Sequence, residues 1–163
     1  MKYIILELIP TSLDPKKGDI IQLSALKIED LKLIDRFDYR ITDDKVPIQS
    51  MLDMISYDKD KFIYKDTKDE IIELFKAFIS DTPLLILNNE YTNNYLEEIE
   101  NEKIDITKLL NMEYTDDLID KIMSKYKLEP SNYIVDLLYE ALMFEMDNNI
   151  WYTNKAVEMI IWV

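Results

Sequence analysis

The sequence has 163 residues, of which 48% are hydrophobic and 32% charged, as expected for one globular domain with a sizeable core. It contains no Cys and no His, which excludes disulfides, thiolate metal sites, Cys nucleophiles and the commonest general base. Nineteen basic against 33 acidic residues give a net charge of −14. An average surface this acidic repels nucleic acid unless a local Lys patch overrides it.

The charge has two interpretations. In the first, a solvated acidic surface keeps the protein in solution. In the second, the acidic surface has a specific role and mimics nucleic acid or docks on a basic partner. The apolar start, MKYIILELIPT, is interrupted by Glu7 and is too short for a signal peptide. Because no apolar stretch is long enough to span a bilayer, we expect a cytoplasmic protein with no membrane contact.

The first forty residues predict an antiparallel meander of three strands. Apolar or alternating runs over residues 2–8, 20–28 and 33–41 are typical of strands. Turn residues at 14–18, with Pro15 and Gly18, separate the first two runs. Glu29 and Asp30 separate the second from the third.

The rest of the chain predicts alternating helices and short strands. A loop with a short helix is expected at 46–57, and a helix capped by Asp66 or Thr67 up to residue 79. Further segments are expected in this order: a strand at 84–87, a helix at 92–100, a strand or turn leading into a helix at 104–110, a helix at 116–126 capped by Thr115, and a helix from Pro130 and Ser131 to 146. The apolar tail at 148–163 fits either helix or strand. Together these elements predict a single α/β domain over 1–163, with a mixed central sheet and flanking helices.

Several segments carry a resemblance to a known superfamily. They are ELIPTSLDP at 7–15, IIQLSALKI at 20–28, IDRF at 34–37, MIS at 54–56, LLILNNEYTNNYL at 84–96, IDITKL at 104–109 and VDLLYEA at 135–141. In order and spacing they resemble the motifs of the ribonuclease-H-like 3′–5′ exonucleases of the DnaQ and RNase T kind, the DEDD superfamily. The resemblance covers nearly the whole chain and implies an α/β ribonuclease-H-like fold.

The resemblance also implies a chemistry that this sequence meets only in part. Such enzymes hold two Mg²⁺ or Mn²⁺ ions with four carboxylates, and a nearby residue acts as general base. At the five matching positions this chain has Glu7, Ile9, Thr92, Val135 and Glu140. Two carboxylates survive, both one methylene longer, and Val135 has no proton to move. We therefore expect no intact catalytic residue and no cofactor.

Few residues of the sequence could support a residual metal-dependent activity. Glu7 and Glu140 could hold a weakly bound Mg²⁺ or Mn²⁺ if any activity persists. The carboxylates available for recruitment are Asp19, Glu90, Asp105 and Asp136, for which solvated or capping roles are commoner. The sequence leaves two alternatives for the old cleft: it is filled, with Ile9 and Val135 packed against neighbours, or it is open and lined by Lys, which would favour nucleic-acid binding.

Three functions follow, of which we expect the first. It is a degenerate exonuclease domain that acts by binding, most plausibly to a protein of nucleic-acid metabolism. An alternative is a weak metal-dependent 3′–5′ exonuclease that uses Glu7, Glu140 and a recruited carboxylate. Another is an acidic inhibitor that occupies a nucleic-acid groove on a partner protein. Direct nucleic-acid binding is disfavoured by the net charge.

Overall fold

The computed structural model describes residues 2–10, 12, 16, 20–40, 68–87, 90–131 and 133–147. Its elements are β1 (Lys2–Pro10), β2 (Ile20–Glu29), β3 (Lys32–Arg40), α2 (Lys68–Ile79), β4 (Leu84–Ile86), α3 (Glu90–Tyr95), β5 (Lys103–Asp105), α4 (Ile106–Leu109), α5 (Leu118–Tyr126) and α6 (Ile134–Asp147). None of these helices is long and apolar enough to cross a membrane. The expected loop at 46–57, the tail at 148–163 and most of the turn at 14–18 lie outside the described residues.

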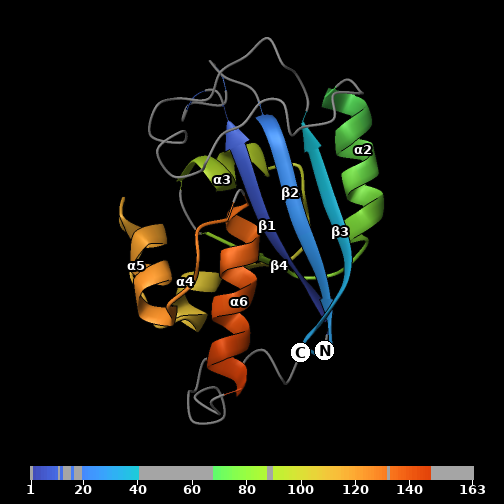
Figure 1. Ribbon diagram of the computed structural model, residues 1–163. Helices are drawn as coiled ribbons and strands as arrows, with labels where there is room; N and C mark the ends of the chain where they lie inside the picture. The colour runs from blue at the N-terminus through green and yellow to red at the C-terminus, as the bar shows by residue number, and fades with distance from the viewer. Residues whose placement is uncertain are drawn as a thin grey trace.

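The described strands form one mixed sheet. Their order is β3-β2-β1-β4-β5, and β1, β2 and β3 are antiparallel neighbours. Strand β4 runs parallel to β1, and β5 runs parallel to β4. Figure 1 shows the three long strands side by side, with helices on both sides of the sheet. This arrangement confirms the predicted α/β fold with an antiparallel meander first.

Strand β1 lies at the centre of the molecule, and its alternate side chains enter two different cores. One set packs with α4, α5 and α6 and consists of Tyr3, Ile5 and Ile9. The other set packs with α2 and the residues that follow α3 and consists of Ile4, Leu6 and Leu8. In Figure 1, α5 and α6 accordingly lie on one side of the sheet and α2 on the other. Because both faces are covered, the buried stretch of the strand after Lys2 carries no charged residue except Glu7.

The helix predicted over 92–100 is wrong in its bounds. Helix α3 spans Glu90–Tyr95, and a turn follows at 96–98. Glu97, Glu98 and Glu100 would have stood in the last turns of the longer helix, at the negative end of its dipole. The described helix has no basic residue in its last turn to offset such charges. The acidic run therefore ends the helix early.

The cap expected from Thr115 is also wrong. Helix α5 begins at Leu118, and Asp117 occupies its N-cap position without a side-chain capping bond. The Thr115 hydroxyl instead accepts a hydrogen bond from Lys121 Nζ at 3.1 Å, and the same ammonium group pairs with Asp117 at 2.8 Å. The Thr115 hydroxyl therefore accepts a hydrogen bond from the Lys121 side chain in the first turn of α5 and does not cap the helix.

The sequence left a solvated or a capping role for Asp105, and the structure shows that Asp105 caps α4. Its Oδ1 accepts hydrogen bonds from the backbone N–H of Thr107 at 3.0 Å and from the Thr107 hydroxyl at 2.7 Å. The bond to the backbone satisfies an N–H that the short helix leaves without a partner. The cap joins β5 directly to α4, since Asp105 is the last residue of the strand.

We predict that Asp105→Ala lowers the free energy of unfolding by about 1 kcal/mol, within the range measured for N-cap removal. Asp105→Asn is the matched control, because Asn caps helices about as well as Asp. Urea unfolding followed by circular dichroism measures both. Equal losses in the two variants would show that the charge, and not the cap, stabilises this corner.

Candidate functional site

A row of polar side chains crosses the α6 side of the sheet. Glu7 of β1 lies opposite Ser24 of β2, and Ser24 lies opposite Asp38 of β3. Residues that face each other across antiparallel strands share a face, so the three side chains form one line across the sheet. The neighbouring position on β2, Gln22, lies on the same face and is 1% exposed. The row ends where the chain leaves β1 towards the turn.

Glu7 is the buried carboxylate of this row. Its exposed fraction is 8%, and the backbone N–H of Ile134, the first residue of α6, donates a hydrogen bond to it. Burial raises the pKa of Glu7 from 4.5 to about 8; the bond from Ile134 opposes this rise, and the negative charge of Asp38 adds to it. The neutral acid therefore predominates near pH 7. Its Oε2 atom is buried and has no hydrogen-bond partner.

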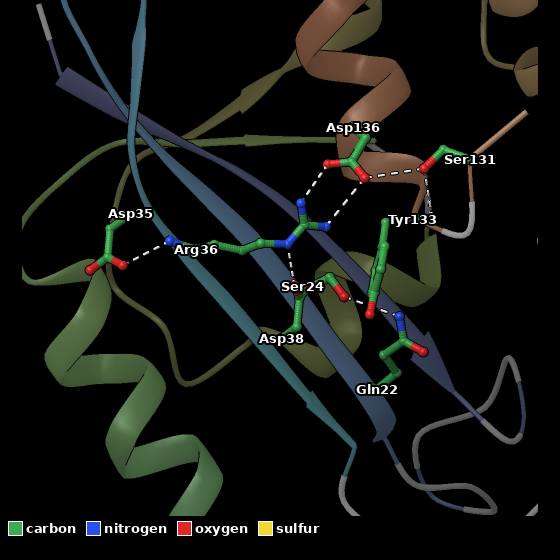
Figure 2. Close-up of polar contacts among 8 residues, drawn as sticks. All are labelled: Gln22, Ser24, Asp35, Arg36, Asp38, Ser131, Tyr133 and Asp136. Carbon is green, nitrogen blue, oxygen red and sulfur yellow. Dashed lines mark hydrogen bonds and ion pairs between the residues drawn. The ribbon is translucent and has the colours of Figure 1, made fainter. Parts of the chain in front are cut away.

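Arg36 joins the outer strand of the sheet to α6. Figure 2 shows its guanidinium between two carboxylates: Nη1 and Nη2 donate to Asp136 at 2.8 and 3.3 Å, and Nε donates to Asp38. The guanidinium also lies 4.5 Å from the centre of the Tyr133 ring. Burial lowers the pKa of Arg36, but the bonds to Asp136 and Asp38 outweigh it and raise the pKa above its ordinary value. Two hydrogen bonds to Asp136 and one aromatic contact thus fix β3 to the start of α6, and the bond to Asp38 holds the guanidinium within β3.

The first turn of α6 is organised around Asp136. Ser131 Oγ donates to Asp136 Oδ2 at 3.1 Å and accepts from the Tyr133 N–H at 3.1 Å (Figure 2). A carboxylate in the first helical turn is stabilised by the helix dipole, and here it is also paired with Arg36. Burial, together with the charge of Asp38, raises the pKa of Tyr133. This end of the helix is therefore strongly polar on the side that meets β3.

Two of the five motif positions lie in one apolar core. Ile9 on β1 is 1% exposed and Val135 on α6 is 0% exposed, and both belong to the cluster between the sheet and the helices α4, α5 and α6. Their alkyl groups occupy the two places where the resemblance implies a metal carboxylate and a general base. The packing on both sides matches the filled arrangement that the sequence left as one alternative.

The other motif positions are distributed over the fold. Thr92 lies on α3 and is buried at 4% exposure. Glu140 is exposed on α6, six residues beyond Ile134, the residue that contacts Glu7. The carboxylate that acts on Glu7 is Asp38, which the sequence motifs do not include.

The carboxylates considered for recruitment have other roles where the structure describes them. Asp136 is paired with Arg36, and Asp105 caps α4. Asp19 and the side chain of Glu90 lie outside the described part of the chain.

Ser24 and Asp38 were missed as site residues by sequence reasoning. The strand pattern of residues 33–41 does place Arg36 and Asp38 on one face, two residues apart. Their position beside Glu7 depends on the pairing register of three strands, which a single sequence does not specify.

Comparison with known proteins gives relatives of one kind. No family model matches the sequence. The DNA polymerase III PolC-type protein of Latilactobacillus sakei is 26% identical over 140 residues, which cover 78% of this chain and 10% of the polymerase. The corresponding protein of Thermotoga petrophila is 21% identical over 141 residues, covering 86% and 10%. The chain thus spans about a tenth of the length of these curated relatives.

Several similar solved structures are nucleases. Exonuclease X in complex with 5′ overhanging duplex DNA has a TM-score of 0.64 at 15% identity, covering 91% of this chain and 93% of that one. Product-bound exonuclease I has a TM-score of 0.61 at 14% identity, covering 98% and 48%. A 3′-exonuclease in specific recognition of a histone mRNA stem-loop has a TM-score of 0.58 at 14% identity, covering 90% and 82%. At these identities the likeness is one of fold, and it confirms the fold that the resemblance implies.

The residues present do not fit a two-metal centre. Such a centre needs several hard oxygen ligands around both ions. Ile9 and Val135 supply none and are packed in the core, and Glu140 is exposed. Among the residues that the structure describes, no three Asp, Glu, His or Cys side chains gather closely enough to hold a metal ion.

We predict that Arg36→Ala lowers the free energy of unfolding by about 1–3 kcal/mol, because Asp136 and Asp38 lose their shared donor in a partly buried setting. Arg36→Lys is the comparison, since an ammonium group keeps the charge but cannot make the forked contact to Asp136. Its stability should lie between those of the wild type and Arg36→Ala. Urea unfolding measures all three proteins, and a wild-type value for Arg36→Ala would show that the network adds no stability.

We predict that the stability of the wild type relative to Glu7→Gln falls as pH rises from about 5 to about 8. Glu7 ionises near 4.5 in the unfolded chain but only near 8 in the folded one, so over this range the folded state holds the extra proton. Gln keeps the neutral shape and does not titrate. Unfolding free energies of both proteins, measured with a metal chelator at several pH values, give the difference. A difference that stays constant with pH would contradict the raised pKa.

Proposed function

We propose that this chain, which has the ribonuclease-H-like fold of the DnaQ-like exonucleases, is a degenerate exonuclease domain that acts by binding and not by cleavage. The burial of Ile9 and Val135 in one apolar cluster carries the proposal. These two positions correspond to a metal ligand and to the general base in the motifs that the sequence resembles. Both are filled by side chains that neither coordinate nor transfer a proton.

The chemistry of the fold explains why these two residues matter. Two-metal cleavage stabilises the attacking and the leaving oxygen with ions held by carboxylates. Ile9 removes an oxygen ligand and also places an alkyl wall beside Glu7, which disfavours any charge that is not fully compensated. Val135 leaves an attacking water without a base at the position where the motif has one. The remaining groups can position and bind, but they cannot assemble the reaction centre.

The charge distribution supports a protein as the partner. The net charge of −14 opposes contact with phosphate backbones and favours a basic protein surface, through long-range attraction that salt weakens. The guanidinium of Arg36, a group well suited to phosphate recognition, is held by Asp38 and Asp136 within the fold. The curated relatives are DNA polymerases of which about a tenth matches this chain, which supports a partner in nucleic-acid metabolism and a cytoplasmic setting.

We predict no cleavage of labelled single-stranded DNA or RNA at high protein concentration with Mg²⁺ or Mn²⁺. The matched control is the Glu7→Ala/Glu140→Ala double variant, purified in the same way, with an active exonuclease as the positive control. Equal traces of cleavage in both preparations would indicate a contaminant and leave the proposal intact. Metal-dependent cleavage by the wild type that the double variant lacks would contradict it and support a weak exonuclease.

A further inference from the structure

The tip of the β2–β3 hairpin exposes three large aliphatic side chains. Leu31 in the turn is 38% exposed, and Leu33 and Ile34 at the start of β3 are 44% and 55% exposed. Six large hydrophobic side chains are exposed among the described residues, so half of them gather within four consecutive positions. Together the three form an apolar tip. Single exposed apolar residues are ordinary, whereas a contiguous group is typical of a surface that something covers.

The backbone of the turn presents the first of these side chains at a conformational cost. Asp30 and Leu31 connect the paired residues Glu29 and Lys32, and both have positive φ angles, of 48° and 66°. Two-residue turns of this kind favour Gly at the second position, because a Cβ atom is unfavourable there. The Leu31 carbonyl accepts a hydrogen bond from the Tyr139 hydroxyl of α6 at 3.3 Å, which holds the turn against the helix.

Ile34 is the extra residue of a β-bulge on the outer strand. Leu33 lies opposite Ile28 and Asp35 lies opposite Lys27, which leaves Ile34 between them without a partner on β2. Strand β3 is the last strand on its side of the described sheet, so no described strand pairs with its outer edge. The apolar tip therefore borders a strand edge at which a further segment can contact side chains and backbone together.

The hairpin tip carries none of the negative excess of the chain. Residues 27–36 have three basic and three acidic side chains, whereas the whole sequence has a net charge of −14. The six are Lys27, Lys32, Arg36, Glu29, Asp30 and Asp35. A surface with balanced charge has no long-range preference for a basic partner, and it suits an occupant that is itself apolar and nearly neutral.

The apolar tail at 148–163, which lies outside the described residues, has this composition. Its last five residues are MIIWV, and Ile150 and Trp151 stand near its start. Its charged side chains are Lys155 and Glu158, which balance each other. The chain thus supplies a segment whose chemistry matches the apolar tip.

Helix α6 brings the start of this tail to the same end of the sheet as the hairpin tip. Near the end of the helix, the Met146 sulfur lies 3.7 Å from the hydroxyl of Tyr3, at the start of β1. The neighbouring Lys2 lies opposite Glu29, the residue before the turn. Figure 1 accordingly shows the last turn of α6 and the β2–β3 turn at the lower end of the view. Sixteen extended residues span up to about 50 Å, so the apolar tip is within reach of residues 148–163.

We propose that the apolar tail at 148–163 docks on its own chain and covers the apolar tip of Leu31, Leu33 and Ile34 beside the outer edge of β3. Docking within one chain removes apolar surface from water at the entropic cost of closing a loop, without the cost of joining two molecules. The contact also shields a strand edge at which other chains could pair. It lies at the end of β1 away from Glu7 and Ile9, so it is independent of the proposed function.

Tryptophan fluorescence of the 163-residue chain tests the contact, because both Trp residues, Trp151 and Trp162, belong to the tail. We expect emission at shorter wavelength, and weaker quenching by acrylamide, in the native protein than in urea. Leu33→Asn/Ile34→Asn should shift the emission to longer wavelength and increase the quenching, since Asn keeps the charge and removes apolar contact surface. Leu74→Asn is the matched control and should leave the emission unchanged, because Leu74 is exposed on α2, on the other side of the sheet from α6.

A second variant keeps the test decisive if the double substitution disturbs the hairpin. Leu31→Gly removes one side chain of the apolar tip and supplies the residue that the positive φ angle favours, so the fold is kept while the emission shifts part of the way. Circular dichroism checks the fold of each variant.

Two sets of results would overturn the proposal. The first is a native emission equal to that in urea, or an emission that neither tip variant changes. The second is protection of the Trp residues that is lost on dilution while light scattering shows a dimer at high concentration, because a second copy would then cover the tip. Equal emission and quenching at every protein concentration, together with the shifts in both tip variants, supports docking within one chain.

Discussion

The burial of β1 on both faces is the constraint on which the rest of the structure depends. A strand covered on both sides gives every side chain a core to fill, so a charged group in it has to find its compensation inside the protein. Glu7 is the charged residue of this buried stretch. The N–H of Ile134, the first residue of α6, stabilises the Glu7 carboxylate in part. Burial raises the pKa of Glu7, so the side chain is mostly a neutral acid and needs no further compensation of charge. The position of α6 and the protonation of Glu7 are therefore coupled.

Helix α6 is fixed by polar contacts at both ends of an apolar face. At its start, Arg36 joins Asp136 to the outer strand, and near its end the buried Glu145 accepts from the Tyr126 hydroxyl and pairs with Lys125 at 2.9 Å. Lys125 also donates to the Leu110 carbonyl at 2.7 Å, so α5 and the end of α4 join the same group. Apolar packing alone allows a helix to slide along a sheet, whereas two separated polar anchors define one position. The apolar cluster that contains Ile9 therefore packs against α6 in one position.

Much of this fold could be predicted from local pattern. The run at 2–8 and the turn before residue 20 indicate β1 and β2, and the apolar spacing of 71, 75 and 79 indicates α2. The C-terminal end of α3 and the start of α5 differ from the sequence prediction. Acidic residues end α3 early, and the Lys121 side chain binds the Thr115 hydroxyl that was expected to cap α5. The candidate site depends on long-range register: 31 positions in sequence separate Glu7 from Asp38, and 100 separate Arg36 from Asp136. Motif matching identified Glu7, but only strand pairing brings Asp38 beside it.

The chemistry of the Glu7 row is difficult to reconcile with a purely structural use of the fold. At a site with two apolar replacements, Ile9 and Val135, a Leu in place of Glu7 would complete the core without any desolvation cost. Instead the row keeps two carboxyl groups and an amide, and each of the three leaves a buried oxygen without a donor. Such atoms lower stability unless a proton, a water molecule or an ion meets them. A proton on Glu7, which burial favours near pH 7, removes one negative charge and makes one oxygen of the carboxyl group a donor to a neighbouring acceptor. The polar row beside Ile9 and Val135 is thus the part of the core whose compensation depends on a proton.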